Sequence, residues 1–335
     1  MQFRSLILSV ATFVIILSCS GKTLYPVYEL DEAAGEVRMG YINGSGEKEI
    51  PALFEQTRPY SEGLAPVRSE GLYGYIDLKG RWVVEPAFDL AFPFAGGIAM
   101  VVVDERCGYI DKKGRWIIEP RFVQGGSFTS SLVPVYDGDS TWLMNKKGEL
   151  IREIPYRYCG DFVDGLALVE QDRSYGFINK KGAEVLPLTY ELSYGFSEGL
   201  ALAVEEGLGG YIDKKGQWVI EPRFAKSGSF AEGRAFFVEE GLTGYLDREG
   251  NIVVDPSYTF GASFSEGLAR VTPKGSSHVG YINKDGEMVI QADYLFGEDF
   301  RDGLALVADE TGLYYIDKSG QVVWQRDRKE INPHG

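Results

Sequence analysis

The sequence predicts an all-β protein built from tandem units of about 34 residues, each an antiparallel hairpin unit. The segment YIDLKGRWVVEP at 75–86 recurs at 109–120 and 211–222, and in weaker form six more times. The Asp or Asn of this segment marks the register: Asn43, Asp77, Asp111, Asn145, Asn179, Asp213, Asp247, Asn283 and Asp317. All steps are 34 residues except one of 36, which places a two-residue loop insertion between Gly267 and Asn283.

The composition of each unit indicates strands and not helices, although a period of 34 also occurs in helical tetratricopeptide repeats. A typical unit holds the β-rich segments 199–203, 210–212 and 218–220, with glycine and proline between them. After residue 18 the chain nowhere shows ten residues of helical periodicity without a glycine or proline, as the 42 glycines make nearly unavoidable. We therefore expect three strands in each unit.

The turn between the second and third segments has a defined chemistry. Asp or Asn begins it, two mostly basic residues follow, and glycine ends it in all nine units. This pattern predicts a type I turn whose glycine takes a positive φ and whose Asp or Asn side chain accepts hydrogen bonds from the turn. The nine glycines are Gly46, Gly80, Gly114, Gly148, Gly182, Gly216, Gly250, Gly286 and Gly320.

Aromatic residues recur at two fixed positions and predict how neighbouring units pack. One lies two residues before the turn Asp or Asn in eight of nine units, Leu143 being the exception. Another lies three residues before the position of a second glycine, which belongs to EGLA-like segments such as 198–201. These aromatic residues are Tyr60, Phe94, Phe128, Phe162, Phe196, Phe230, Phe264 and Phe300. A three-stranded unit cannot bury its apolar face alone, so we expect these rings to form a core shared between neighbours.

The segment GYIDKKGRWIIEP at 108–120 resembles the WG repeat of bacterial proteins, and the resemblance extends from about Tyr25 to Trp324. The Trp after the turn glycine is present only as Trp82, Trp116 and Trp218, which favours a packing role for it. The resemblance implies an all-β repeat fold and brings no catalytic residues.

The units are predicted to stack in an open or superhelical array, with a closed β-propeller as the alternative. Propeller blades usually hold four strands in about 40 to 50 residues, and one chain end usually completes the blade of the other. Here both ends look like whole units. The predicted boundaries are a leader at 1–18, a short linker at 19–24, nine repeats at 25–324 and a polar tail at 325–335.

The first residues have the pattern of an export signal. An apolar run from Leu6 to Leu17 follows Arg4 and is too short to span a bilayer comfortably. It ends in Ile16, Leu17, Ser18 and Cys19, which resembles the bacterial lipobox. This predicts lipidation of Cys19 and an outer-membrane or cell-envelope lipoprotein that faces the periplasm or the outside; the alternative is an ordinary secretory signal.

The charge and composition of the chain argue against several classes of ligand. Without residues 1–18 the chain has 33 basic and 49 acidic residues, a net charge of −16, which argues against nucleic acid and anionic lipid as ligands. Cys107 and Cys159 show no known disulfide spacing, and His278 and His334 have no neighbours at metal-ligand spacing. We expect neither a metal nor a cofactor.

Alternate loops of a hairpin array fall on opposite edges, which sorts the charges. The turns such as Lys112 and Lys113 are predicted on a basic edge. An acidic edge is predicted to hold the following residues: Asp104, Glu105, Glu205, Glu206, Glu239, Glu240, Asp309 and Glu310, with Glu85, Glu119, Glu221 and Asp255.

Catalysis needs an asymmetric set of groups, whereas the carboxylates here are copied from unit to unit and are expected to belong to turns: Glu62, Asp164, Glu198, Glu232, Glu266 and Asp302. The sequence therefore favours a non-enzymatic binding or scaffold protein for another envelope or host protein. A carbohydrate or peptidoglycan binder is the alternative, and a glycoside hydrolase with paired carboxylates is a remote one.

Overall fold

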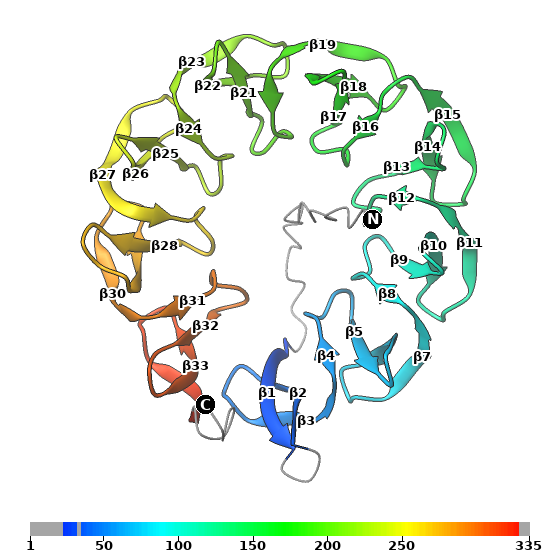
Figure 1. Ribbon diagram of the computed structural model, residues 1–335, viewed down its shortest axis with the longest axis vertical. Helices are drawn as coiled ribbons and strands as arrows, with labels where there is room; N and C mark the ends of the chain where they lie inside the picture. Colours follow the sequence, from blue (N-terminus) through cyan, green and yellow to red (C-terminus); the bar gives the residue numbers. More distant parts are fainter. Residues whose placement is uncertain (1–22, 32–34, 328–335) are drawn as a thin grey trace, which may run out of the picture.

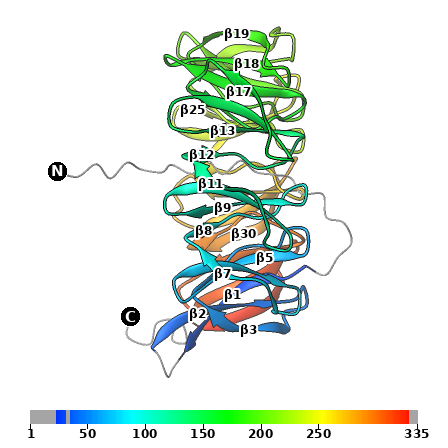
Figure 2. The same ribbon diagram turned by 90° about the vertical axis from the view of Figure 1, so that its right-hand side faces the viewer.

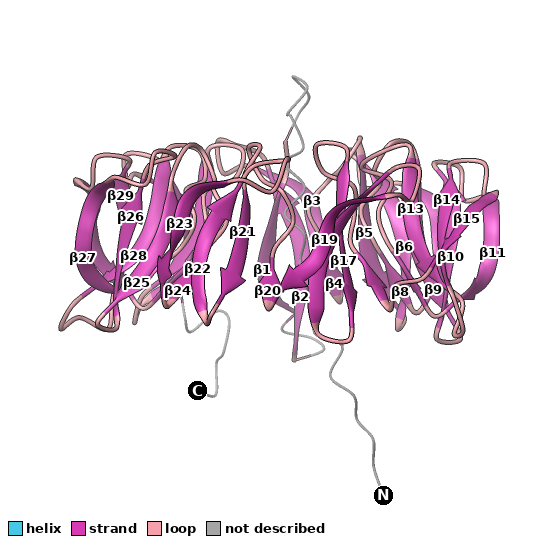
Figure 3. Ribbon diagram, turned by 90° about the horizontal axis from the view of Figure 1, so that it is seen from above, coloured by secondary structure: helices cyan, strands magenta, loops and turns pink. Residues whose placement is uncertain are grey.

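The computed structural model describes residues 23–31 and 35–327, and the regular elements of these residues are all β-strands. Figure 1 shows the strands grouped in small sheets around a ring. Figures 2 and 3 show the same ring from the side and from above, as a flat body whose strands run between its two edges. No helix in the described part is long and apolar enough to cross a membrane. The predicted all-β class with tandem antiparallel units is confirmed.

Each unit contains two long hairpin strands and a third strand at the outside of the ring (Figure 1). The first hairpin strands are β1 (Tyr25–Asp31), β5 (Leu64–Ser69), β9 (Ile98–Val103), β13 (Leu132–Tyr136), β17 (Leu166–Gln171), β21 (Ala201–Glu205), β25 (Ala235–Glu239), β28 (Leu268–Pro273) and β32 (Leu304–Ala308). The second hairpin strands are β2 (Glu36–Ile42), β6 (Leu72–Asp77), β10 (Arg106–Asp111), β14 (Thr141–Asn145), β18 (Ser174–Asn179), β22 (Leu208–Ile212), β26 (Leu242–Leu246), β29 (Val279–Asn283) and β33 (Gly312–Asp317). The outer strands are β3 (Lys48–Phe54), β7 (Trp82–Phe88), β11 (Trp116–Phe122), β15 (Leu150–Ile154), β19 (Glu184–Tyr190), β23 (Trp218–Phe224), β27 (Ile252–Gly261), β30 (Met288–Tyr294) and β34 (Val322–Asp327).

A short additional strand, which the sequence did not reveal, precedes the hairpin in most units. These two-residue strands are β4 (Gln56–Thr57), β8 (Leu90–Ala91), β12 (Gln124–Gly125), β16 (Tyr158–Cys159), β20 (Leu192–Ser193), β24 (Lys226–Ser227) and β31 (Phe296–Gly297). In unit 8 the end of β27 takes this place, so units 7 and 8 form one seven-stranded sheet. Units 2 to 9 are therefore four-stranded, and the expectation of three strands holds only for unit 1.

The ends of the array meet, which is the arrangement of the propeller alternative. Tyr25, Val27 and Ile42 of unit 1 share one apolar cluster with Leu304 and Tyr315 of unit 9. The Tyr315 hydroxyl donates to the Pro26 carbonyl oxygen at 2.8 Å. Each sheet stays separate, as expected for a repeat array, but the curvature of that array returns unit 9 to unit 1 (Figure 1).

The core lies between units, as the aromatic pattern predicts. Tyr75, Phe94 and Val101, for example, are buried in one cluster that joins units 2 and 3. The Trp after the turn glycine packs edge to face on the preceding unit: Trp82 on Phe54, Trp116 on Phe88 and Trp218 on Tyr190. Buried aromatic surface of this kind supplies much of the cohesion between repeats.

The folded part extends slightly beyond the predicted repeat boundaries. Leu24, expected in the linker, is buried with Tyr41 and Ile50. The strand β34 continues through residues 325–327, which were expected in the polar tail. Residues 1–22, 32–34 and 328–335, which include the leader and Cys19, lie outside the described part.

Candidate functional site: the two edges of the ring

The turns that begin with Asp or Asn lie along one edge of the ring, which we call the turn edge. In unit 3 the Asp111 Oδ1 accepts the N–H groups of Lys113 and Arg115 at 2.9 and 3.0 Å, and Gly114 has φ 76°. Burial opposes ionisation of Asp111, but the hydrogen bonds of Arg115 and Lys113 together outweigh it and lower the pKa of this carboxyl. The predicted turn chemistry is thus present.

The turn glycine has a second role that the sequence did not show. A Cβ on Gly114 would lie 2.9 Å from Cγ1 of Val84, which belongs to the preceding unit. Gly80, Gly148 and Gly250 face Ile50, Ile118 and Ile220 in the same way. The residue is therefore glycine both because of its positive φ and because the neighbouring unit approaches closely.

The repeated carboxylates before the second glycine lie in turns, as predicted, and they link neighbouring units. Glu62 has φ 52°, and its carboxylate accepts the N–H of Gly97 in the next unit at 3.0 Å. The Nζ of Lys112, also in the next unit, lies 3.0 Å from the carboxylate and donates to the Glu62 carbonyl. Burial alone would raise the pKa of Glu62, but the hydrogen bond and charge of Lys112 lower it.

The same link recurs around the ring. Glu198, Glu232 and Glu266 accept N–H groups of Gly233, Gly267 and Gly303. Lys284 and Lys318 pair with Glu232 and Glu266, both at 3.1 Å. The first basic residue of the turn therefore links two units although it stays partly exposed. The second basic residue is exposed as well and takes no part in this link, as in Lys79, Lys113, Lys147, Lys181 and Lys215.

A row of tyrosines forms a further inter-unit ladder. Each hydroxyl donates to a backbone oxygen 17 residues further along the chain, as Tyr75 does to Phe92 at 2.7 Å and Tyr245 to Ala262 at 2.8 Å. Burial raises the pKa of Tyr211 to about 12, so its hydroxyl remains a donor. Tyr315 makes the corresponding bond across the closure.

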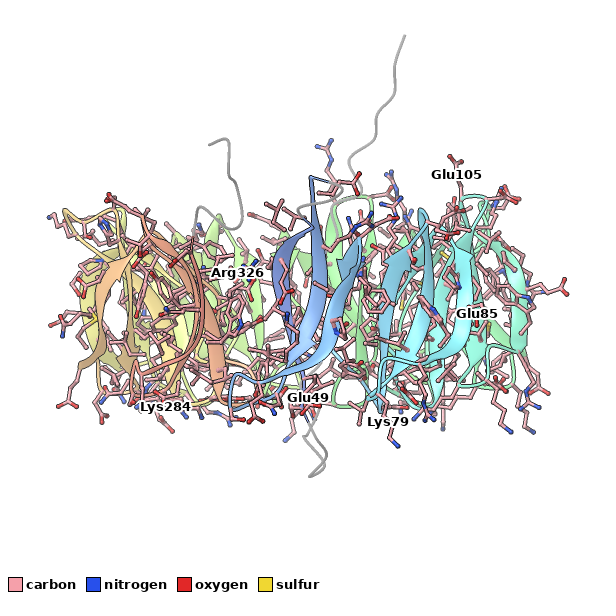
Figure 4. All side chains as sticks on the ribbon, turned by 90° about the horizontal axis from the view of Figure 1, so that it is seen from below. Glu49, Lys79, Glu85, Glu105, Lys284 and Arg326 are labelled. Carbon is pink, nitrogen blue, oxygen red and sulfur yellow. The ribbon has the colours of Figure 1, made fainter. Side chains whose placement is uncertain are left out.

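The opposite edge, the hairpin edge, carries tips that are rich in carboxylates. Figure 4 shows Glu105 at this edge and Lys79 and Lys284 at the turn edge. No ion pair within the described residues involves Asp104, Glu105, Glu205, Glu206, Glu239, Glu240 or Glu310. Asp309 differs, because its Oδ1 accepts the N–H of Thr311 and of Gly312 within the loop.

The predicted membership of the acidic edge was wrong for the residues that precede the prolines. Glu85 lies in the middle of β7, and Figure 4 shows it on the outer surface between the edges. Glu119 and Glu221 hold the same position in β11 and β23. The outer strands cross the full height of the ring, so the central residues of these strands belong to neither edge.

Exposed apolar side chains accompany the hairpin edge. Leu90, Tyr158, Leu192, Phe260 and Phe296 occupy equivalent positions in five units and are 37 to 45% exposed. Leu90 pairs with Val102, two residues from the hairpin tip at Asp104. The same position is Gln or Lys in three other units, so the apolar residues are not required by the repeat itself. Carboxylates and exposed apolar side chains together make the hairpin edge the strongest candidate for an interaction surface.

Of the residues singled out from the sequence, Cys19 lies outside the described part. Cys107 and Cys159 are free and buried, and burial raises the pKa of the Cys159 thiol to about 12. His278 lies in the loop insertion of unit 8, where its N–H donates to Ser276 Oγ. The described residues contain no group of three His, Cys, Asp or Glu side chains that could hold a metal ion.

The family follows from these repeats. The model of the WG containing repeat matches eight successive segments: 39–73, 73–107, 108–139, 143–173, 175–208, 210–242, 244–275 and 280–310. The chain belongs to the WG containing repeat family. The matched WG segments run from the second hairpin strand of one unit into the next unit, so the family motif spans the junction on which the ring depends.

The ring of WG units is similar to solved structures of unrelated sequence. A structure titled as a eukaryotic initiation factor aligns with a TM-score of 0.65 at 12% identity, over 92% of this chain and 97% of that chain. Dihydro-heme d1 dehydrogenase NirN gives a TM-score of 0.49 at 16% identity, over 79% of this chain and 73% of that chain. The first likeness shows the fold alone, and no curated protein matches the WG chain.

Proposed function

We propose that this WG repeat protein is a non-enzymatic binding or scaffold protein, and that it docks another envelope or host protein on its hairpin edge. The observation that carries the proposal is the contrast between the two kinds of carboxylate. Those of Glu62, Glu232 and Glu266 are held by N–H groups and lysines of the next unit. Those of the hairpin tips are exposed and lie beside exposed apolar side chains.

A basic protein segment is the partner that fits this surface. Unpaired carboxylates attract cations over about 8 Å at physiological salt, while apolar side chains supply the contact area. Because the tips recur around the ring, a partner can contact several units at once, which increases the apparent affinity. No catalytic role is assigned, since each engaged carboxylate repeats the role of its counterparts in the other units.

The docking proposal is tested by crosslinking in intact cells with two matched variants of the full chain. The first removes six charges from the hairpin edge by Asp104→Asn, Glu105→Gln, Glu205→Gln, Glu206→Gln, Glu239→Gln and Glu240→Gln. The control removes turn-edge charges by Lys113→Gln, Lys147→Gln, Lys181→Gln and Lys215→Gln. We expect the first variant to lose a salt-sensitive crosslinked protein that the control retains; equal capture by both variants would refute the assignment of the edge.

Carbohydrate binding is the second candidate, because exposed aromatic rings at the hairpin edge can stack on sugars. Tyr158 and Phe296 are 43 and 45% exposed. Glycan binding that disappears with Phe296→Ala and persists in the six-charge variant would favour this function over protein docking.

The lipid anchor belongs to the same proposal: we place the protein at the outer membrane or elsewhere in the cell envelope through lipid on Cys19, facing the periplasm or the outside. Labelling with palmitate tests it. Wild-type chain should incorporate label and fractionate with membranes, whereas Cys19→Ala should do neither. Label that persists in Cys19→Ala would contradict the site.

A further inference from the structure

The nine junctions between consecutive units share a small set of contacts, which permits a direct comparison. A ring pair crosses eight of the nine junctions, with centroids 4.7 to 5.6 Å apart, including Tyr25 with Tyr315 at the closure. A tyrosine hydroxyl bond crosses seven junctions, including the closure. Each pair or bond fixes one unit on the next.

The junction between units 4 and 5 lacks both. Leu143 takes the place of the tyrosine, so neither a hydroxyl nor a ring is available to meet Gly160 and Phe162. The Cys159 thiol contacts the Gly160 oxygen at 3.5 Å, but this contact lies within unit 5 and does not cross the junction. The neighbouring junction differs, because Phe177 there keeps its ring pair with Phe196 at 4.7 Å.

The link between the carboxylate before the second glycine and the turn lysine of the next unit, as in Glu62 with Lys112, is also reduced at this junction. Ser130 stands where six units have Glu or Asp; unit 3 has Gly96 there, and Lys146 donates to its carbonyl at 3.2 Å. Lys180, the counterpart of Lys112, therefore reaches only the hydroxyl of Ser131 at 3.3 Å. The next junction again keeps an ion pair, from Lys214 to Asp164 at 3.5 Å.

The chain connection is longest at the same place. Residues 155–157 separate β15 from β16, whereas a single residue separates β7 from β8 and β11 from β12. Between units 7 and 8 the strand is continuous. Units 4 and 5 are thus joined by the longest connection outside the strands, and the fewest hydrogen bonds, ring pairs and ion pairs cross their junction.

A buried carboxylate without a cationic partner also distinguishes the junction of units 4 and 5 from the junction of units 8 and 9. Asp161 lies against Gly126 of unit 4 and accepts the N–H of Ser127. Its counterpart Asp299 is paired with Arg270 at 3.2 Å, but Pro134 occupies the position of that arginine in unit 4. Burial without a cation raises the pKa of Asp161 to about 6.

We propose that the ring opens at the junction between units 4 and 5, and not at the closure where units 9 and 1 meet. The apolar cluster of Leu143, Phe162 and Val169 holds the closed form. Opening exposes that cluster while the rest of the ring stays assembled. Local openings of this kind occur where directed contacts are fewest.

The two buried cysteines provide a test on the full chain without any substitution. Cys107 and Cys159 are 7 and 8% exposed in the closed ring, and the Cys159 thiol has the higher pKa. In the closed form Cys159 should therefore react more slowly with a thiol reagent. Opening at the proposed junction predicts the reverse: mass spectrometry should find Cys159 modified several-fold faster. Faster modification of Cys107, or equal rates, would overturn the proposal.

A stitched variant gives a second test. Leu143→Tyr with Ser130→Glu introduces the residue types that make the ring pair, the hydroxyl bond and the carboxylate link at other junctions, and Phe177→Tyr adds one hydroxyl at the adjacent junction as control. Hydrogen exchange of peptides that cover 154–165 should slow roughly tenfold in the stitched variant and stay unchanged in the control. If peptides of the closure, 25–31 and 312–327, exchange before those of 154–165 in the wild-type chain, the ring opens elsewhere and the proposal fails.

Discussion

The hydroxyl of Tyr245 offers the cleanest measurement of what one rung of the tyrosine ladder contributes. Tyr245 is fully buried, and its hydroxyl donates to the Ala262 oxygen in the next unit at 2.8 Å. The ring also packs on Phe264 with centroids 5.0 Å apart. Tyr245→Phe removes the bond and keeps the ring. The equivalent position in unit 5 is Phe177, buried with its ring pair intact, so phenylalanine fits this environment.

The expected loss of unfolding free energy is about 1 to 2 kcal/mol, made up of the net hydrogen bond and the cost of leaving the Ala262 oxygen unpaired. Urea unfolding measures it, with Tyr194→Phe as the control. Tyr194 is 46% exposed, and within the described residues its hydroxyl makes no hydrogen bond, so we expect a change below about 0.5 kcal/mol there. If Tyr245→Phe were as stable as the control, the ladder would have no energetic role and the comparison of junctions would lose its basis.

Three further predictions concern glycine, charge and pH. Gly114→Ala should cost about 2 kcal/mol, more than Gly71→Ala, because both have positive φ but only Gly114 faces a neighbouring unit, and thermal unfolding compares them. A double-mutant cycle of Glu232→Gln and Lys284→Met should give a salt-sensitive coupling of about 0.5 kcal/mol, as expected for a part-exposed pair at 3.1 Å; a coupling unchanged by 1 M salt would contradict the ion pair. Asp161→Asn should stabilise the protein above pH 6 by at most about 3 kcal/mol and have little effect at pH 4. The folded chain holds the Asp161 proton more tightly than the unfolded chain, so the wild-type protein loses stability as the pH rises through about 6, and denaturant midpoints at both pH values test this. The nearby Tyr109, Tyr158 and Cys159 stay neutral in that range.

The features that the sequence predicted are those decided within one unit. The turn at Asp111 requires only a side-chain oxygen and a glycine three residues further along the chain, and both are visible in every copy. The strand periodicity and the aromatic positions were visible for the same reason. These choices depend on local backbone preference and on burial, which the sequence of one unit already contains.

Closure of the ring depends on the angle between units, which no single unit displays. Nine units complete a circle when each turns by about 40° relative to the last, and a few degrees less would leave an open array. That angle is set by contacts such as Gly114 against Val84, in which the missing side chain of the glycine and the volume of the valine decide how closely the units approach. The same limit hid the short strands β4 and β8, whose pairing needs the hairpin that follows them.

The link from Glu62 to Lys112 could have been found from sequence. An acid and a lysine separated by 50 residues recur as Asp164 with Lys214 and as Glu266 with Lys318, the last pair lengthened by the insertion in unit 8. Strand pattern alone assigns the two residues to different loops of different units. Only the knowledge that loops of adjacent units share an edge turns the spacing into a contact.

Where units 9 and 1 meet, different residue types make the contacts that link the other units. Unit 1 has glycine, Gly44, where units 3 to 9 have lysine or arginine, and the Tyr25 ring lies 3.9 Å from the Cβ position of that glycine. The Tyr25 hydroxyl donates to the Asp302 carbonyl, which elsewhere accepts from a lysine. Unit 1 also has no carboxylate at the position of Glu62, so unit 2 has no such partner for a turn lysine. Unit 2 has Leu78 in place of the lysine, and this side chain packs against the core. Because the closure keeps its directed contacts by such exchanges and the junction of units 4 and 5 does not, the weakest point of this ring lies within the chain and not at its ends.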